Sequence, residues 1–256
     1  MKHWLGLVGV VLGLILTSPL RSYANDYASD PFDPAIARNA WLMIGDAEKQ
    51  NNIPSGLLHA MSLVETGQGI SGWMMPWPYT VGINGTGKKD FKSAPEALLQ
   101  LQRWRALGFT RFNVSLNAKA HTNMKAPAAE ALLQAAGTGL VFVRIEGRNF
   151  ARRFNNAAEA EAFLQRLFAH GYRNVDVGMM QINWRVHSQH FRSVREALEP
   201  TRNLAYAVQY LLEHRQTRDW WGSVGRYHSG TALYANRYVR NVYSMYMRIH
   251  RANNNA

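Results

Sequence analysis

An internal duplication constrains the fold of this chain more than any other feature of its sequence. Residues 91–114 align with residues 154–177 at an offset of 63, with ten identities in 24 positions. Upstream, Val81–Gly85 matches Val143–Gly147 with a one-residue gap. Each copy has the pattern of a strand, a turn, a short strand, a helix, a glycine and a final strand. Two copies predict a small α+β unit whose strands can pair with each other, rather than a solenoid.

Helical patterns flank the duplication on both sides. Apolar residues recur at helical spacing over 33–49, 54–66, 203–214 and 232–250, and Ser193 with Glu196 forms a capping box. The sequence therefore predicts a mainly α fold. In it, a helical domain over residues 25–70 and 178–256 is interrupted by a repeated α+β insert over 71–177, with copies at about 79–117 and 141–177.

The first 24 residues have the pattern of a secretory signal peptide. Lys2 precedes a thirteen-residue apolar run, and Ser22 and Ala24 supply small residues at the positions that a signal peptidase reads. The run is short for a membrane span, which needs about 20 residues. We expect cleavage after Ala24, export to the periplasm and no stable membrane anchor afterwards.

The charge and the absence of cysteine narrow the function classes. The chain has no cysteine, which excludes disulfides and thiolate metal sites. Its net charge of +12 suggests nucleic acid, but an exported basic protein meets anionic cell-envelope polymers instead. His187 and His190 have the spacing of half a metal site, but the chain offers no cysteine and no matching acidic motif to complete it. A surface pair is the simpler interpretation.

Glu65 is the first candidate for catalysis. It lies four residues after Met61 and seven after Leu58, on the apolar stripe of its helix. A carboxyl in that place is partly desolvated, so its pKa rises and it can act as a general acid near neutral pH. The alternative, a glutamate at a helix end that faces water, stays open from this pattern alone.

Two further segments carry polar groups that can line a binding groove. One is Gly178-Met179-Met180-Gln181-Ile182-Asn183, and the other is Gly225-Arg226-Tyr227-His228-Ser229-Gly230. Each is also compatible with an ordinary structural role. His228 beside Ser229 does not form the nucleophile elbow of a hydrolase.

Taken in order, these three segments resemble the SLT-type lytic transglycosylases, the goose-lysozyme-like enzymes that cleave peptidoglycan. The helix that ends in Glu65-Thr66 resembles the family's Glu-Ser motif, Gly178–Ile182 its Gly-Leu-Met-Gln-Ile motif, and Arg226–Gly230 its Ala-Tyr-Asn-Ala-Gly motif. Tyr238 to Val242 fits the closing Tyr-x-x-x-Val. The segments Pro76–Thr80 and Asn174–Gly178 look like the branch associated with conjugation and secretion machines, in which a single insert is usual.

The resemblance implies a lysozyme-like fold and a lyase that acts on the bond between N-acetylmuramic acid and N-acetylglucosamine, leaving 1,6-anhydro ends. Glu65 matches the catalytic acid/base. The residues that match or adjoin the substrate groove are Thr66, Met180, Gln181, Asn183, Tyr227, His228 and Tyr238. His228 and Ser229 replace the family's Asn and Ala. The implied partners are glycan strands and a secretion, conjugation or pilus complex, without nucleic acid, cofactor or metal.

Two other functions are compatible with the same residues. A lysozyme-like muramidase uses water and a second carboxylate, for which Asp176 is the nearest candidate, although its repeat partner Asn113 favours a structural role. A glycan-binding assembly factor without catalysis would explain the doubled insert. Intact Glu65, Gln181 and Tyr227 favour catalysis.

Overall fold

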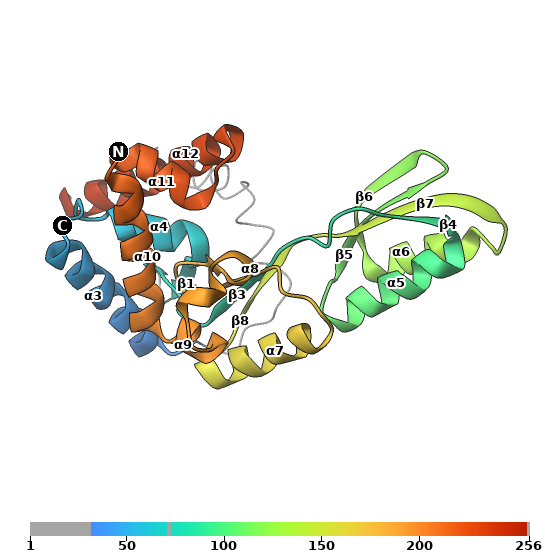
Figure 1. The fold of residues 1–256 in the computed structure, drawn as a ribbon, viewed down its shortest axis with the longest axis horizontal. Helices are drawn as coiled ribbons and strands as arrows, with labels where there is room; N and C mark the ends of the chain where they lie inside the picture. Colours follow the sequence, from blue (N-terminus) through green and yellow to red (C-terminus); the bar gives the residue numbers. More distant parts are fainter. Residues whose placement is uncertain (1–31, 71–72, 255–256) are drawn as a thin grey trace, which may run out of the picture. The chain divides into compact units, whose positions relative to one another are not determined.

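The computed structural model describes residues 32–70 and 73–254 of the chain, and the predicted signal peptide lies outside these residues. The fold is mainly α, as the sequence predicts, with ten α-helices and ten short strands in the described part (Figure 1). The chain divides into two compact units, one of residues 1–81, 152–164 and 176–256, the other of residues 82–151 and 165–175. No helix within the described ranges has the length and apolarity that a membrane span requires.

Helices form the body of the first unit. They are α3 (Pro34–Gln50), α4 (Leu57–Thr66), α8 (Trp184–His187), α9 (Val194–Leu198), α10 (Pro200–Arg215), α11 (Trp220–His228) and α12 (Ala232–Asn254). In α4 every residue except Glu65 is buried. The helix begins at Leu57 rather than at Pro54, because Gly56 takes a φ of 88° just before it. Helix α4 packs against α3 and α12, so a helix buried on nearly all sides lies at the centre of this unit (Figure 1).

A buried polar pair joins α3 to α4. The Glu48 carboxylate accepts hydrogen bonds from the backbone N–H groups of Gly56 at 2.8 Å and His59 at 3.1 Å. The His59 ring contacts the same carboxylate through Nδ1 at 3.1 Å, and its Nε2 lies 3.0 Å from the Trp41 carbonyl oxygen. The carboxylate thus satisfies N–H groups at the start of α4, which otherwise have no partner inside the helix.

Two sheets belong to the first unit in whole or in part. A two-stranded hairpin pairs β1 (Gln68–Ile70) with β2 (Trp73–Met75). A four-stranded sheet has the order β10-β9-β3-β8, where β3 is Thr80–Ile83, β8 is Phe150–Arg153, β9 is Val175–Val177 and β10 is Ile182–Asn183. Helix α7 (Ala157–Ala169) connects β8 to β9.

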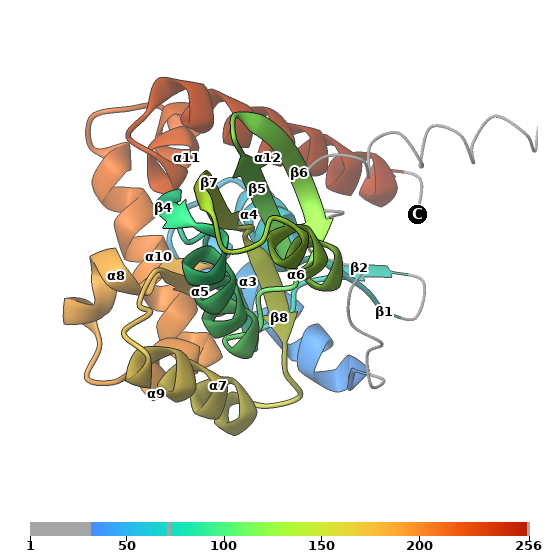
Figure 2. The ribbon, with the colours of Figure 1, turned by 90° about the vertical axis from the view of Figure 1, so that its right-hand side faces the viewer.

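The second unit is a four-stranded sheet with two helices on one face. Its order is β4-β7-β5-β6, where β4 is Lys89–Ser93, β5 is Arg111–Leu116, β6 is Lys119–Lys125 and β7 is Leu140–Gly147. Helices α5 (Ala94–Ala106) and α6 (Ala126–Ala135) lie side by side (Figure 2). Buried residues of strand and helix meet between them, among them Phe112, Ile145, Leu101 and Leu133.

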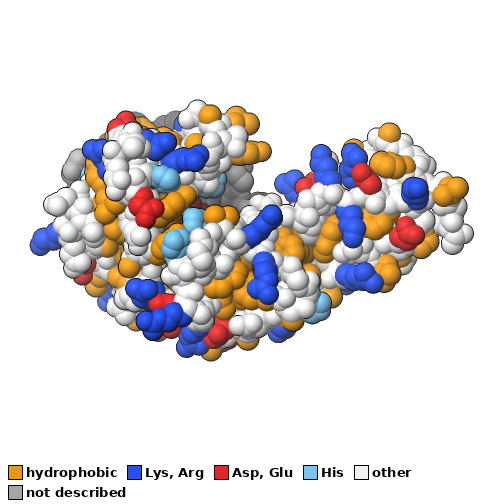
Figure 3. Space-filling view, viewed as in Figure 1, with side chains coloured by type: hydrophobic (Ala, Val, Ile, Leu, Met, Phe, Trp, Pro, Cys, Tyr) orange, Lys and Arg blue, Asp and Glu red, His pale blue; other side chains and the backbone are white. Residues whose placement is uncertain are grey.

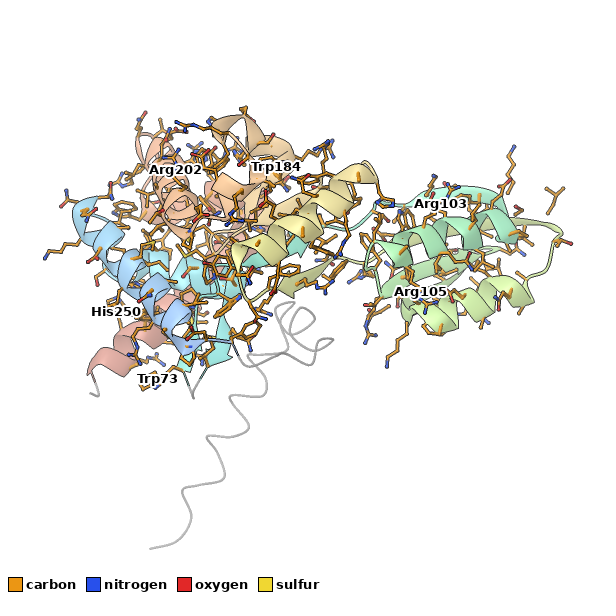
Figure 4. All side chains as sticks on the ribbon, turned by 90° about the horizontal axis from the view of Figure 1, so that it is seen from below. Trp73, Arg103, Arg105, Trp184, Arg202 and His250 are labelled. Carbon is orange, nitrogen blue, oxygen red and sulfur yellow. The ribbon has the colours of Figure 1, made fainter. Side chains whose placement is uncertain are left out.

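Most of the charged side chains of the second unit are basic. Its residues carry a net charge of +8 out of +12 for the whole chain, and Lys and Arg outnumber acidic residues on the face in view (Figure 3). Two of its four carboxylates are held by arginine. Arg105 of α5 reaches toward α6 (Figure 4), where its guanidinium donates to both oxygens of Glu130 at 3.0 and 2.9 Å. Arg144 donates to both oxygens of Asp90 at 2.6 and 3.0 Å.

The strands that match between the two sequence copies lie in different sheets and exchange their middle members. In one sheet, β7 of the second copy lies between β4 and β5 of the first. In the other, β3 of the first copy lies between β8 and β9 of the second. In both sheets the N–H just after the middle strand donates to a carbonyl oxygen at or just before the start of a neighbouring strand: Arg148 to Arg111 at 2.9 Å, and Asn84 to Asn174 at 3.1 Å.

The domain limits expected at residues 71 and 177 and the duplicated origin of the insert stay predictions.

Candidate active site

Glu65 lies in the last turn of α4, within the first unit. Its side chain is 16 % exposed, and no hydrogen bond of good geometry is formed by its carboxyl oxygens within the described part of the chain. Burial raises the pKa of Glu65 from 4.5 to about 8, the Tyr238 hydroxyl lowers it, and the negative charge of Asp176 raises it further. The carboxyl therefore keeps its proton at neutral pH while part of it still faces solvent.

Helices α11 and α12 supply the groups that face this carboxyl. Gly225 lets the two helices approach closely, because a Cβ at that position would lie 3.1 Å from Val239. The close packing puts the His228 ring parallel to the Tyr238 ring, with centroids 4.4 Å apart and planes 4° apart. His228 Nδ1 is 4.0 Å from Glu65 Oε1. The Tyr238 hydroxyl is buried near Glu65 but falls short of a well-formed hydrogen bond.

Tyr227 connects this group to the turn between β9 and β10. Its hydroxyl donates to the Met180 carbonyl oxygen at 2.8 Å. Burial, followed by the charge of Glu65, raises the pKa of both Tyr227 and Tyr238 well above 10, so both phenols stay protonated.

Asn203 holds that turn from α10. Its Oδ1 accepts from the Met180 N–H at 2.9 Å, and its Nδ2 donates to the carbonyl oxygens of Val177 at 2.8 Å and Ala197 at 2.9 Å. Gly178 has a φ of 81°, and a Cβ there would lie 2.3 Å from Asn203 Nδ2. Glycine is therefore required at this position both for its backbone conformation and for space.

The amide side chains of the same turn are bound to the protein frame. Gln181 has a φ of 48° and donates through Nε2 to the carbonyl oxygens of Gly178 at 2.7 Å and Thr80 at 3.2 Å. Asn183 donates to Asp176 Oδ1 at 2.7 Å and caps α8 by accepting from the Val186 N–H at 3.2 Å. Trp184 follows at the start of α8 (Figure 4). Both amides are half-buried.

Two predicted groove residues are fully buried. Thr66 is 0 % exposed, and its hydroxyl lies 3.1 Å from the Ser62 carbonyl oxygen, 3.2 Å from the Met179 carbonyl oxygen and 3.3 Å from the Trp77 N–H. The Met180 side chain is also 0 % exposed. Thr66 joins α4 to the turn of residues 178–181, called here the Met-Gln turn, and Met180 joins that turn to α10 and α11. Direct contact of either residue with a substrate stays a prediction.

The structure thus brings Glu65, Tyr227, His228 and Tyr238 together, with Asp176 near enough to influence the carboxyl. Within residues 32–70 and 73–254, no three His, Asp or Glu side chains gather as metal ligands. Chemically, the site offers one carboxyl that is protonated near neutral pH, surrounded by neutral rings. Such a group can give a proton to a leaving oxygen and later accept one.

Residues 153–246 match the Transglycosylase SLT domain family. The matched stretch includes the Met-Gln turn, Asn203, Tyr227, His228 and Tyr238, and the mainly α fold agrees with it. Glu65 and Thr66 lie upstream of the match, so the structure alone links them to it. No curated protein and no solved structure matches the chain.

The sequence pattern did not identify Asn203 and Glu48, two buried polar residues whose hydrogen bonds hold the Met-Gln turn and the start of α4 in place. Asn203 is a buried polar residue inside an otherwise regular amphipathic helix, and two of its three partners are 23 and 26 residues away. Glu48 has the same character. The available signal was weak: a polar residue at a core position of the periodic pattern, which predicts a buried hydrogen-bonding role.

Proposed function

We propose that this chain is a peptidoglycan lytic transglycosylase with Glu65 as its single acid/base. The observation that carries the proposal is the raised pKa of Glu65, about 8, on the helix that packs against the SLT-matching segment. A general acid works best when its pKa lies near the working pH.

Two proton transfers complete the reaction. Glu65 protonates the oxygen that joins N-acetylmuramic acid to N-acetylglucosamine, and the bond from the muramoyl C1 to that oxygen breaks. The muramoyl C6 hydroxyl oxygen then bonds to C1, and its proton returns to Glu65. The product has a 1,6-anhydro end, the enzyme regains its starting state, and no water is consumed.

The surrounding residues have separate proposed roles. Gln181 and Asn183 line the groove beside the cleaved bond, on a turn that Asn203 fixes. Tyr227 and Tyr238, both protonated, offer hydroxyls close to the carboxyl. Thr66 joins α4 to the turn through the Met179 carbonyl oxygen, and Met180 joins the turn to α11 through the Tyr227 hydroxyl.

Hydrolysis by a muramidase is the competing reaction. It needs a second free carboxylate near the sugar. Asp176 is the only nearby candidate that electrostatics identifies in the described residues, and its Oδ1 is already bonded to Asn183. This bond favours the single-carboxyl mechanism.

The decisive experiment uses residues 25–256 with purified sacculi and mass spectrometry of the products. We expect products one water lighter than those of lysozyme, and no products from Glu65→Gln. Glu96→Gln, an exposed carboxylate in α5, is the matched control and keeps full activity. Reducing ends that vanish in Asp176→Asn would establish the muramidase instead, and binding without products would establish a glycan-binding factor.

We also propose a periplasmic location and local wall opening for a conjugation, secretion or pilus apparatus. The signal pattern of residues 1–24 and the motifs Pro76–Thr80 and Asn174–Gly178 support this proposal. Cell fractionation with N-terminal sequencing of the mature protein tests the location. A mature protein in the cytoplasm that still begins at Met1 would contradict it.

A further inference from the structure

His228 is held rigidly at the end of α11 by its packing on α12. Its ring stacks on Tyr238, which is 4 % exposed, and the two planes differ by only 4°. Gly225, one turn before His228, lets α11 approach α12 closely, because a Cβ there would lie 3.1 Å from Val239. One edge of the His228 side chain remains open, since 44 % of it is exposed. The ring plane is thus fixed while one edge can meet a ligand.

The fixed ring directs a nitrogen at the candidate catalytic carboxyl. Nδ1 is 4.0 Å from Glu65 Oε1, about 1 Å more than a hydrogen bond to a carboxylate. Hydrogen bonds in active sites are often long without substrate and shorten when the substrate binds. We propose that His228 is a positioning residue that donates Nδ1–H to the Glu65 carboxylate once this acid has released its proton.

A neutral imidazole suits this role better than a permanent cation. Burial lowers the pKa of His228, so the ring is neutral at neutral pH. The groups that face Glu65 are His228 and Tyr227 from α11, Tyr238 from α12 and Asp176 from β9. A lysine or arginine would ionise Glu65 permanently, whereas a neutral N–H stabilises the carboxylate only after it forms.

The use of this contact in turnover rests on the proposed function. In the first proton transfer, Glu65 becomes a carboxylate, and the Nδ1–H bond holds it in place. In the second, Glu65 takes the proton from the C6 hydroxyl, and the bond to Nδ1 lengthens again. His228 keeps its own proton throughout, so the balance of the reaction is unchanged.

Two substitutions separate the ring of His228 from its N–H donor. His228→Phe keeps a flat ring for stacking on Tyr238 but removes the donor, and His228→Asn keeps an N–H donor without the ring. His190→Asn changes an exposed histidine and is the matched control. Thermal unfolding of each variant shows that the fold is kept.

The first readout is the ionisation of Glu65, followed by infrared difference spectroscopy against Glu65→Gln, and it needs no catalysis. We expect His228→Phe to raise the proton affinity of Glu65 about tenfold, because a hydrogen bond to a charged group is lost. His228→Asn should bring it back toward the native value. An unchanged Glu65 ionisation in His228→Phe, or the same rise in both variants, would overturn the proposal.

The second readout is turnover of sacculi. His228→Phe should reduce kcat by about tenfold to a hundredfold with little change in KM, and His228→Asn should recover part of that loss. If the native protein itself releases no products, the proposed function fails, while the Glu65 ionisation still decides the contact with His228.

Discussion

At the scale of single residues, the environment of one carboxyl decides what the site can do. Glu65 is the one residue of α4 that is not buried, and yet the surrounding helices remove most of its water. Among the described residues, those that act on it are phenols, a neutral imidazole and the Asp176 carboxylate, and none is a cation that offsets the cost of ionisation. The carboxyl therefore behaves as an acid of pKa about 8.

The pH dependence of activity follows from that value. A general acid must carry its proton, so the initial rate on sacculi should stay high up to about pH 8 and fall above it, by about tenfold for each further pH unit. Initial rates measured in buffers of constant ionic strength test this expectation. A rate that rises steadily through pH 9 would contradict an acid role for Glu65.

The raised pKa of Glu65 should also make the folded protein less stable at alkaline pH. Its pKa is about 8 in the folded protein and near 4.5 when unfolded. Between these values the unfolded chain releases the proton and the folded protein keeps it, so the free energy of unfolding falls as the pH rises from 4.5 to 8. We expect Glu65→Gln to be more stable than the native protein above pH 8, by on the order of 3 kcal/mol, with no gain below about pH 4.

Urea unfolding at pH 4 and pH 9 measures this difference. Glu96→Gln removes an exposed carboxylate in the first turn of α5 and serves as the control. Its stability should differ from that of the native protein by less than about 1 kcal/mol at either pH. A gain in Glu65→Gln that does not depend on pH would mean that packing, rather than ionisation, is the cause.

At the scale of elements, the turn between β9 and β10 depends on a helix far along the chain. Asn203 of α10 is 0 % exposed and satisfies one N–H and two carbonyl groups of neighbouring segments. Without it, these buried groups would have no partner, and each such loss costs about 1–3 kcal/mol.

We therefore expect Asn203→Leu to lower the free energy of unfolding by about 3 kcal/mol and to reduce activity further by loosening the turn. Urea unfolding measures the first effect and turnover of sacculi at saturating substrate the second. Asn236→Leu, an exposed asparagine of α12, is the control and should change neither. Unchanged stability in Asn203→Leu would show that water replaces the side chain.

Local elements were predictable from the sequence because their signals are local. The helical periods over 33–49 and 203–214 correspond to α3 and α10, and Ser193 caps α9 by accepting from the Glu196 N–H, as the capping box predicts. The segment that holds β6 and α6 carried no prediction. Glu65 was identified from its position on a helical stripe, but Asn203 was not, because its partners lie in other elements.

Strand pairing was not predictable for a different reason. The duplication predicts that two similar strand-helix-strand copies exist, and the structure has that order in β4-α5-β5 and β8-α7-β9. It does not say which copy receives each middle strand, because β3 and β7 have similar sequences and fit either sheet. Only the tertiary structure shows whether each middle strand pairs within its own copy or within the other copy.

At the scale of the whole molecule, the exchange places all four strands of the sheet β4-β7-β5-β6 between residues 85 and 148. This segment can therefore be removed without interrupting the sheet β10-β9-β3-β8. The Phe154 N–H, just after β8, donates to the Tyr79 carbonyl oxygen, just before β3, at 3.0 Å. The two neighbouring strands therefore run in opposite directions, and the end of β3 lies beside the start of β8. A tight hairpin can join them, because antiparallel neighbours need only a two-residue turn.

We expect a chain in which Asn-Gly replaces residues 85–148 to fold and to keep the sheet order β10-β9-β3-β8. In the full chain the ring of Phe150 packs edge-on against Phe109, and the deletion removes Phe109 and exposes this ring. The free energy of unfolding should therefore fall by about 2 kcal/mol. Circular dichroism and urea unfolding test the fold, and products from sacculi test the site. As a control, the same turn in place of residues 115–148 removes the end of β5 and all of β7, which leaves β4 and β5 without the strand between them. This variant should aggregate. If the first deletion also aggregates while the full chain folds, the exchanged strands belong to one inseparable unit, and the duplicated segment is part of the core rather than an insert.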